Sequence, residues 1–349
     1  MRYEPPIDRA RLIGTIRDLY GFPVVGLTFV PVGYAAACYT VLCEGGARYF
    51  LKLWPGTRAG RASAVRPDVV LPLTRALHDR GLLPRVPYPV ATRDGALWAN
   101  FIGDPFAVFP FFPGRAPPPW HEWPDDLRDE LARTIAAIHR ATPALTDVLP
   151  PRETFAIPFE ADLTAGLAAI ERIGPRARSG LRALRHLTLP RRGEILAQLT
   201  RLHGLQHAVR GLSGPFVLCH TDIGGDNLLV DDRGELHVLD WDDATVAPPE
   251  YDLQAALGDD LGEGIGRFLD IYGAARGAHP LHLEHFAFYL LRRYLGDMTA
   301  RLLRILEENT TAAQDEDALG GIEMWGFAQW SALDETLAVV AAALRSHGV

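Results

Sequence analysis

The sequence predicts an α+β protein in which a strand-rich first part is followed by a mainly helical remainder. Residues 1–108 contain short apolar runs with period-two alternation, separated by glycine-containing turns. The segment Phe109–Gly114 is apolar and interrupted by proline and glycine, and beyond it apolar residues recur at helical spacing. We therefore expect two lobes, 1–108 and 115–349, joined by a hinge at 109–114, with residues 160–210 forming a helical insertion in the second lobe.

The first lobe is expected to be an antiparallel sheet with two helices. The helices are Ile7–Tyr20, which Gly21 stops, and Asp68–Gly81. The strands are Leu27–Val32, Cys38–Leu42, Arg48–Trp54, Leu97–Phe101 and Phe106–Phe109. Because side chains alternate along a strand, Phe50, Lys52 and Trp54 should share one face of the third strand, opposite Leu51 and Leu53.

The second lobe is expected to be helical apart from one strand-rich patch. A helix begins near Trp123 and carries the apolar stripe Leu127, Leu131, Ile135 and Ile138, and the chain ends in helices over His282–Leu306 and Gly321–Leu344. The patch contains a strand at Phe216–Cys219 and a hairpin of Leu228–Val230 with Leu236–Leu239 across the turn sequence Asp231–Gly234. The hairpin folds the chain back, so Asp222 and Asp240 should lie close together.

Bulk composition indicates a cytosolic globular protein. The chain has 349 residues and is 48% hydrophobic and 22% charged, which is ordinary for a globular chain. Its first twenty residues mix acidic and basic side chains, and its apolar runs are far below the ~20 residues that span a bilayer. The three cysteines, Cys38, Cys43 and Cys219, predict neither a disulfide framework nor a zinc site.

Charge is distributed unevenly along the chain. Residues 220–263 contain thirteen carboxylates and one basic residue, Arg233, so this window carries −12 while the whole chain carries −8. Such a window suggests metal ions, a cationic ligand or both, and a solvated acidic surface is the alternative beyond Asp252. Lys52 is the only lysine among 35 basic residues, which suggests a position where a compact ammonium is needed rather than a planar guanidinium.

The residues around Asp222 have the pattern needed for phosphoryl transfer. In kinases a catalytic-loop aspartate is followed five residues later by a metal-binding asparagine, and Asp222 and Asn227 have this spacing. Asp240 ends the following strand, where a carboxylate can bind Mg²⁺, and Lys52 can reach the α- and β-phosphates. His220 is expected to bond loop backbone and orient Asp222, and Asp242 either supports the metal or is simply exposed.

Several longer segments resemble the aminoglycoside phosphotransferase family, and among its branches the spectinomycin phosphotransferases. They are Val217–Asn227, Leu239–Asp242, Ala247–Leu253, Leu19–Gly21, Leu27–Pro31, Tyr49–Leu53 and Leu77–Gly81. The resemblance implies a bilobal protein-kinase-like fold, ATP or GTP bound at the hinge, two Mg²⁺ ions, and transfer to a hydroxyl of a small molecule.

The resemblance also assigns individual residues. It makes Asp222 the catalytic residue, Asn227 and Asp240 the metal ligands, Lys52 the phosphate-binding lysine, and Phe109, Pro110 and Phe111 the hinge that holds the nucleotide base. Two positions depart from the family pattern. The acid that pairs with the lysine corresponds to Asp68, which is one methylene shorter than glutamate, and the phosphate-covering loop retains only Gly33.

The leading functional hypothesis is an antibiotic kinase acting on a cationic aminocyclitol, such as spectinomycin, or a related compound. Carboxylates that could meet the amines of such an acceptor are Asp259, Asp260, Glu263 and Asp297. Kinases of metabolites such as choline, homoserine, methylthioribose or hydroxylysine are the alternative, because fold and motif fix the reaction better than the acceptor.

Three other classes are disfavoured. A nucleotide-binding pseudokinase does not require the complete set of Lys52, Asp222, Asn227 and Asp240. The arginines between 172 and 192 lie on several helix faces without interleaved aromatic residues, which favours a solvated surface over nucleic-acid binding. The pairs His203/His207 and His282/His285 have helical spacing but no identifiable third metal ligand.

Overall fold

The computed structural model of the chain describes residues 2–33, 35–58, 60, 66–254, 264–277 and 279–347. These residues form two compact units. The first comprises the described parts of Met1–Arg152, Phe216–Asp260 and Phe268–Gly277, and the second those of Glu153–Pro215, Leu261–Arg267 and Ala278–Val349. No helix in the described part of the chain is long and apolar enough to cross a membrane.

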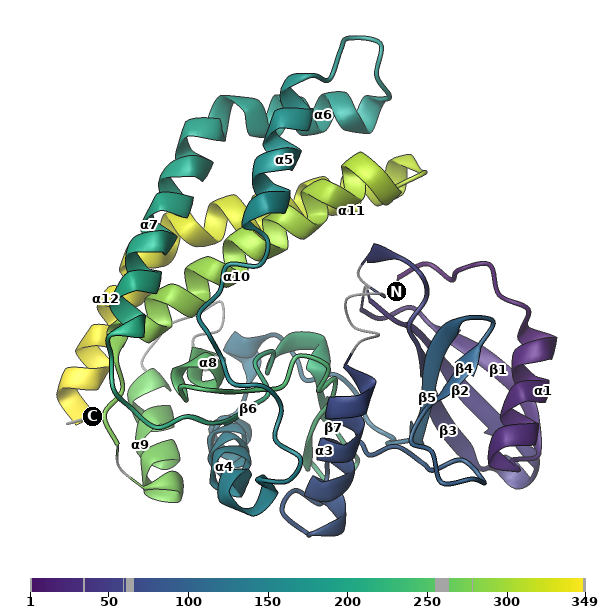
Figure 1. The fold of residues 1–349 in the computed structure, drawn as a ribbon. Coiled ribbons are helices and arrows are strands. Elements are labelled where there is room, and N and C mark those ends of the chain that lie inside the picture. Colours follow the sequence, from purple (N-terminus) through teal and green to yellow (C-terminus); the bar gives the residue numbers. More distant parts are fainter. Residues whose placement is uncertain are drawn as a thin grey trace. The chain divides into compact units, whose positions relative to one another are not determined.

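The first unit begins with a five-stranded antiparallel sheet (Figure 1). Its strands, in spatial order, are β1 (Val24–Val30), β2 (Ala37–Cys43), β3 (Arg48–Leu53), β5 (Asp104–Pro110) and β4 (Ala99–Phe101). All five expected strands are present. The first starts and ends earlier than expected because a register shift at Val24–Gly26 admits Val24 to the ladder, and Pro31, which has no N–H, follows its last residue.

Helix α1 (Arg9–Tyr20) covers one face of this sheet. Asp8 caps its first turn by accepting a hydrogen bond from Arg11 N, and Gly21 ends it with a left-handed φ of 74°. Leu12 and Ile16 pack into a cluster that also contains Leu51 and Leu53 of β3. This is the helix, and the face of β3, that the sequence predicts.

The opposite face of the sheet carries a second apolar cluster. It contains Trp54, Ala107 and Phe109, with Phe50 packed against it and Leu71 contributed by helix α3 (Pro67–Asp79). Pro67 occupies the first turn of α3, where a missing N–H costs nothing. Lys52 lies between Phe50 in β3 and Trp54, which directly follows the strand, and both aromatic residues belong to this cluster. The expected grouping of the three residues on one face is confirmed.

The rest of the first unit contains helices and two small two-stranded sheets. The helices are α4 (Asp125–Ala141), α8 (Glu250–Leu253) and, from Phe268 onward, α9 (Gly264–Arg276). The strand pairs are β6 (Val217–Cys219) with β9 (Thr245–Ala247) and β7 (Leu228–Val230) with β8 (Leu236–Val238). The β7–β8 hairpin is the one predicted, and Asp231 stabilises its turn by accepting hydrogen bonds from Arg233 N and Glu235 N. Strand β9 was not expected.

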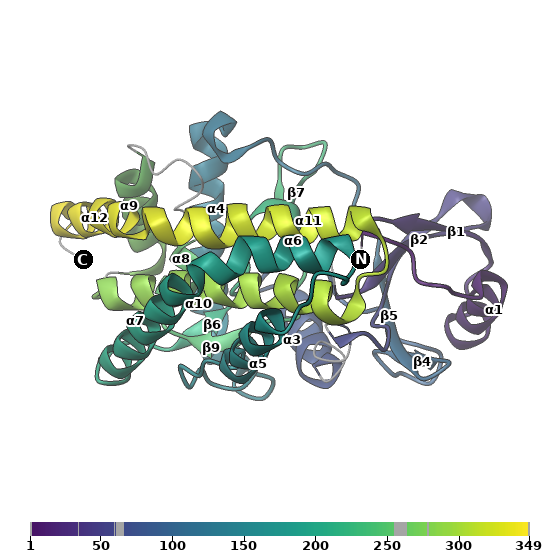
Figure 2. The same cartoon turned by 90° about the horizontal axis from the view of Figure 1, so that it is seen from above.

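The second unit is helical (Figure 2). Its main helices are α5 (Glu160–Glu171), α6 (Ser179–Thr188), α7 (Arg192–Arg210), α10 (Leu283–Leu303), α11 (Ala312–Ile322) and α12 (Gln329–His347). Helix α10 packs against α5, α7, α11 and α12, so it forms the centre of the unit. Arginines of the 172–192 stretch form ion pairs here, Arg178 with Asp315 and Arg192 with Glu171.

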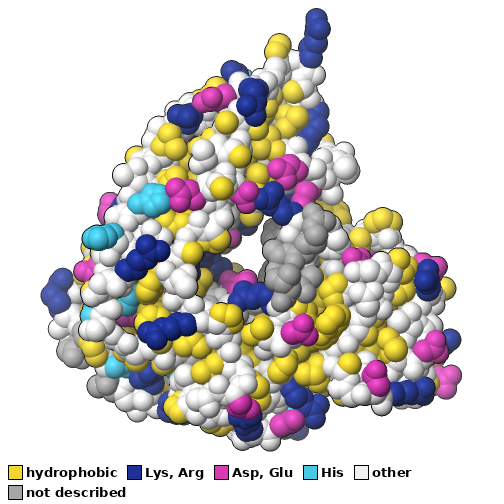
Figure 3. All heavy atoms as spheres, viewed as in Figure 1, with side chains coloured by type: hydrophobic (Ala, Val, Ile, Leu, Met, Phe, Trp, Pro, Cys, Tyr) yellow, Lys and Arg dark blue, Asp and Glu magenta, His cyan; other side chains and the backbone are white. Residues whose placement is uncertain are grey.

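Charged side chains of both signs are interspersed over the face drawn in Figure 3. On this face the Lys and Arg side chains of the described residues are scattered and do not gather in one large basic patch.

Candidate active site

Lys52 lies in the middle of the sheet and meets two carboxylates from far along the chain. Strand β3 pairs with β2 and β5, which places Lys52 opposite Cys38 on one side and Ala107 on the other. Its Nζ atom lies 2.6 Å from Asp240 Oδ1 and 2.9 Å from Asp242 Oδ2. The Lys52 side chain is almost entirely buried, so its charge depends on these two partners.

The ion pairs determine the protonation of the cluster. Burial alone would lower the pKa of Lys52, but the carboxylates of Asp240 and Asp242 offset it and raise the pKa above its ordinary value. Partial removal from water opposes ionisation of the half-exposed Asp240 carboxyl, but the Lys52 ammonium outweighs this and lowers the pKa of that carboxyl. Lys52 is therefore an ammonium and Asp240 a carboxylate at neutral pH.

The loop after β6 holds Asp222 through His220 and Asn227. His220 Nδ1 accepts a hydrogen bond from Asp222 N at 3.3 Å, and His220 Nε2 donates to Leu239 O at 2.8 Å. These partners fix the Nε2–H tautomer. The role expected for His220, bonding loop backbone beside Asp222, is confirmed. Asn227 Nδ2 donates to Asp222 Oδ2 at 2.7 Å and to Asp222 O at 3.0 Å, which orients the carboxylate.

Leu239 connects this loop to Asp240. Its carbonyl accepts from His220 Nε2, and its N–H donates to Asn227 O at 2.8 Å. Since Asp240 is the next residue, these two bonds hold it beside the loop that carries Asp222 and Asn227. The predicted hairpin thus brings the two segments together.

Two residues of this region have left-handed backbone conformations that are unusual for residues with a side chain. Thr221 has a φ of 76° and Asp240 a φ of 59°. Such conformations cost about 1–3 kcal/mol each and persist only where the surroundings fix them. For Thr221 the fixing contacts are its N–H to Asp252 Oδ1 at 2.6 Å and its hydroxyl to Asp243 O at 3.1 Å.

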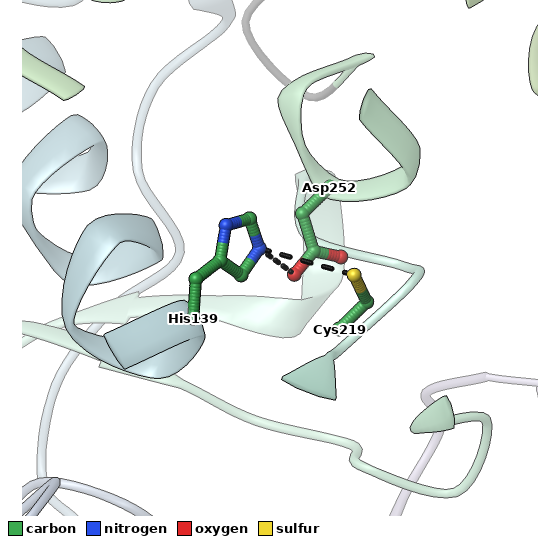
Figure 4. A group of neighbouring side chains, drawn as sticks. All are labelled: His139, Cys219 and Asp252. Atoms are coloured by element: carbon green, nitrogen blue, oxygen red, sulfur yellow. Dashed lines mark hydrogen bonds and ion pairs between the residues drawn. The ribbon is translucent and has the colours of Figure 1, made fainter. Parts of the chain in front are cut away.

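A buried group of side chains supports the loop from behind (Figure 4). Asp252, in α8, accepts hydrogen bonds from the N–H groups of His220 and Thr221 at 2.9 and 2.6 Å. His139, on α4, lies with Nε2 3.1 Å from Asp252 Oδ2 and Nδ1 2.8 Å from the Tyr272 hydroxyl. We call Asp252, His139 and Tyr272 the support chain.

Cys219 completes the group in Figure 4, with its Sγ 3.9 Å from His139 Nε2. His139, Cys219 and Asp252 form the one three-residue group with metal-binding potential among the residues that the structure describes. Their ligand atoms are already hydrogen-bonded, and both Asp252 oxygens face backbone N–H donors. The arrangement is therefore a hydrogen-bond network rather than a metal centre.

Sequence reasoning missed the support chain. In the sequence Asp252 belongs to the acidic window and to a family segment, and neither His139 nor Tyr272 falls within a motif. One signal was available for His139, which follows Ile135 by four residues and so continues the apolar stripe of α4. A polar side chain on a buried helix face needs a hydrogen-bonding partner.

The expected partner of Lys52 on α3 lies elsewhere. Asp68 accepts a hydrogen bond from Trp98 Nε1 at 2.8 Å, while the ion pairs of Lys52 with described residues are those with Asp240 and Asp242. The structure therefore does not bring Asp68 to Lys52. Asp242, for which an exposed position was one interpretation, is instead mostly enclosed and paired with this lysine.

The remaining residues of the expected site fall in several places. Phe109 and Pro110 end β5, and Phe111 follows them with the Arg48 guanidinium 4.1 Å from its ring centre. Gly33 follows β1 with a left-handed φ of 63°. Asp297 lies on α10 in the second unit, 3.9 Å from Arg301, and Asp259, Asp260 and Glu263 lie outside the described residues.

The sheet, the helical remainder and the loop–hairpin–carboxylate arrangement define a protein-kinase-like phosphotransferase fold. The sequence model of the phosphotransferase enzyme family matches residues 26–289. The chain belongs to this family, and the predictions of a protein-kinase-like fold and of a phosphotransferase are confirmed. A comparison with curated proteins finds no match.

Solved structures with the same fold include kinases of several small molecules. A spectinomycin phosphotransferase in complex with ADP and spectinomycin has a TM-score of 0.74 and 18% identity, over 97% of this chain and 99% of that one. An amicoumacin kinase in complex with AMP-PNP and Ca²⁺ has a TM-score of 0.59 and 18% identity, over 91% and 93%. A microcompartment-associated aminopropanol kinase has a TM-score of 0.58 and 18% identity, over 94% and 98%. At this identity the likeness establishes the fold.

Proposed function

We propose that the protein transfers the γ-phosphoryl group of ATP or GTP to a hydroxyl group of a small cationic molecule in the cytoplasm. One observation carries this proposal. The Asp222–Asn227 hydrogen bond and the Lys52–Asp240 ion pair are joined through Leu239 into a single cluster. Phosphoryl transfer needs a proton acceptor, metal ligands and a phosphate-binding cation at one place, and this cluster offers all three.

Asp222 is the proposed general base. Its carboxylate accepts the proton of the acceptor hydroxyl as the hydroxyl oxygen forms its bond to the γ-phosphorus and the bond from that phosphorus to the leaving oxygen of the nucleoside diphosphate breaks. Asn227 Nδ2 holds one carboxylate oxygen of Asp222, and His220 holds the backbone. A positioned base of this kind contributes roughly 10²–10⁴ in rate.

Asn227 and Asp240 are the proposed ligands of Mg²⁺. Their side chains fit a hard cation, because Asp240 offers a half-exposed carboxylate and Asn227 keeps its amide oxygen for the ion while its nitrogen bonds Asp222. An Mg²⁺ ion held by these two residues would supply positive charge to offset that of the phosphates. Lys52 contacts the phosphates as a point charge, and Gly33 together with the Phe109–Phe111 segment holds the nucleotide.

An aminoglycoside or aminocyclitol antibiotic, such as spectinomycin, is the first acceptor we propose. It is supported by the fold shared with a phosphotransferase solved with spectinomycin and a kinase solved with amicoumacin. The acidic window of the sequence suits a cationic acceptor, and Asp259, Asp260, Glu263 and Asp297 are the carboxylates proposed to meet its amines.

A small metabolite is the second candidate acceptor. It is favoured by the fold shared with an aminopropanol kinase at a TM-score of 0.58, whose name indicates an amino alcohol substrate. Choline, homoserine, methylthioribose and hydroxylysine represent this class. Because the same chemistry serves both groups of acceptors, the two candidates differ only in which hydroxyl compound is bound.

The test is an acceptor screen with purified protein. ADP or GDP release is measured with ATP or GTP and Mg²⁺ against spectinomycin, other aminoglycosides, aminopropanol and the four metabolites, with Asp222→Ala in parallel. Turnover with an antibiotic that Asp222→Ala abolishes supports the first candidate. Turnover restricted to a metabolite supports the second, and equal, background-level activity in both proteins would indicate a pseudokinase.

A further inference from the structure

Asp242 is the least expected member of the cluster around Lys52. We infer that Asp242, and not an acidic residue of α3, is the positioning residue that holds Lys52 in place for the nucleotide phosphates. The inference rests on the proposed nucleotide-dependent reaction and names a further residue needed for it.

The contacts of Lys52 separate Asp242 from its rival on α3. Asp242 Oδ2 lies 2.9 Å from Lys52 Nζ, whereas the Asp68 carboxylate accepts from Trp98 Nε1. Helix α3 is linked to the segment after Asp240 by a different pair, the Arg66–Asp243 ion pair at 2.7 Å. The helix is thus connected to the metal-ligand segment without using Lys52.

Asp242 is itself held in position by the strand that carries Lys52. Trp54 Nε1 donates to Asp242 Oδ2 at 2.9 Å, and the same oxygen faces Lys52 Nζ. Trp54 is buried and lies two residues after Lys52, on the same face of β3, with its ring centre 5.6 Å from Nζ. The three side chains form a closed triangle, so Asp242 has a defined orientation before any ligand binds.

The two carboxylates that meet Lys52 are suited to different tasks. The Asp240 side chain is 42% exposed and that of Asp242 is 17% exposed. Asp240, the proposed metal ligand, is the carboxylate that can turn toward a cation. Lys52 is buried, and leaving it without a partner would be costly. Asp242 therefore remains as an ion-pair partner of Lys52 when Asp240 turns toward a metal ion.

Two kinds of variant separate positioning from simple charge. In Asp242→Asn a negative charge beside the phosphates is lost, which by itself would strengthen ADP binding. If Asp242 positions Lys52, binding weakens instead. Trp54→Phe removes the donor that fixes Asp242 without changing any charge. Asp68→Asn tests the rival on α3, and Asp79→Asn, at the exposed far end of that helix, is the matched carboxylate-to-amide control.

The measurement is calorimetric binding of ADP and of adenosine in EDTA, with no divalent metal present. We expect Asp242→Asn to lower ADP affinity about tenfold and Trp54→Phe about threefold, with adenosine affinity changed less than about twofold, since only the phosphates contact Lys52. Asp68→Asn and Asp79→Asn should bind ADP like wild type. Unchanged adenosine binding also shows that each variant is folded.

Three results would overturn the inference. The first is ADP affinity that is unchanged or increased in Asp242→Asn. The second is a loss seen only when Mg²⁺ is added, which would make Asp242 a metal ligand. The third is a larger loss in Asp68→Asn than in Asp242→Asn. If wild type binds neither ADP nor GDP under any condition, the proposed function fails as well, so the two failures are distinguishable.

Discussion

The candidate active site has two parts, the loop that carries Asp222 and the surroundings of Lys52, and these are stabilised in different ways. The loop that carries Asp222 is held from behind by the support chain, in which the Asp252 and His139 side chains have no exposed surface. Lys52 is held by Asp240 and Asp242, whose carboxylates are partly exposed. The loop is therefore fixed by folding, whereas beside the lysine the more exposed carboxylate, Asp240, is free to turn toward a ligand. Substitutions in these two parts should therefore differ in their effects on kcat and on the free energy of unfolding.

The largest effect is expected from Asp222→Ala. If Asp222 is the general base, its removal lowers kcat by roughly 10²–10⁴. It should change the free energy of unfolding little, because the side chain is only half-buried and takes no part in the support chain. Steady-state kinetics and urea unfolding measure both quantities. Asp232→Ala, in the exposed turn of the β7–β8 hairpin, is the matched control. A kcat equal to that of wild type would exclude Asp222 as the base.

Asp252→Asn should damage stability and activity together. The carboxylate accepts from two backbone N–H groups and from His139. An amide offers one neutral acceptor oxygen, and its NH₂ group can only donate, so one of these donors would lose its acceptor. We expect a loss of about 2–4 kcal/mol in the free energy of unfolding. Because Thr221 would lose the contact that holds its left-handed backbone, kcat should fall as well. A destabilised variant with normal kcat would show that the support chain stabilises the fold without positioning the loop for catalysis.

The surroundings of Lys52 can be examined through the thiol of Cys38, which lies opposite this lysine in the sheet. Burial raises the pKa of Cys38, which pairs with Lys52 across β2 and β3, to about 11. The unfolded thiol loses its proton near pH 9, so the native state binds more protons between these values and stability falls as pH rises. From pH 8.5 to 10.5 wild type should lose roughly 1.5 kcal/mol more than Cys38→Ala. If urea unfolding shows that wild type and Cys38→Ala lose the same stability as the pH rises, the pKa of Cys38 is not raised in the folded protein.

The sequence was informative where chemistry is local. Strand alternation was enough to place Lys52 beside Phe50 and Trp54, and the turn around Asp231 was enough to predict the hairpin that returns Asp240 to the loop. The position of His220, two residues before Asp222, gave its role. Each of these inferences uses residues that are close in sequence or in one regular element.

The contacts that could not be predicted join distant residues. Lys52 and Asp242 are 190 positions apart in the numbering, and nothing in either segment distinguishes Asp242 from Asp68 as the partner. The choice depends on where α3 and the Asp240 segment pack. Asp252 and His139 are likewise brought together only by folding, and a buried polar network has no periodic signature in a sequence.

The smallest expected effect tests how far the support chain extends. Tyr272, on α9, meets His139 Nδ1 at 2.8 Å, so Tyr272→Phe leaves the ring in place and removes one buried hydrogen bond, at a cost of about 1 kcal/mol. If Tyr272 stabilises the fold but does not influence the loop that carries Asp222, kcat stays within about twofold of wild type while the urea midpoint falls. If α9 instead helps to hold the loop that carries Asp222, kcat of Tyr272→Phe falls further than the loss of folded protein explains. A His139→Gln variant with wild-type kcat would contradict a role for α9, because Tyr272 reaches Asp252 through His139. Rigid support by buried residues predicts the first outcome, because Asp252 is the member of the support chain that accepts from the N–H groups of His220 and Thr221.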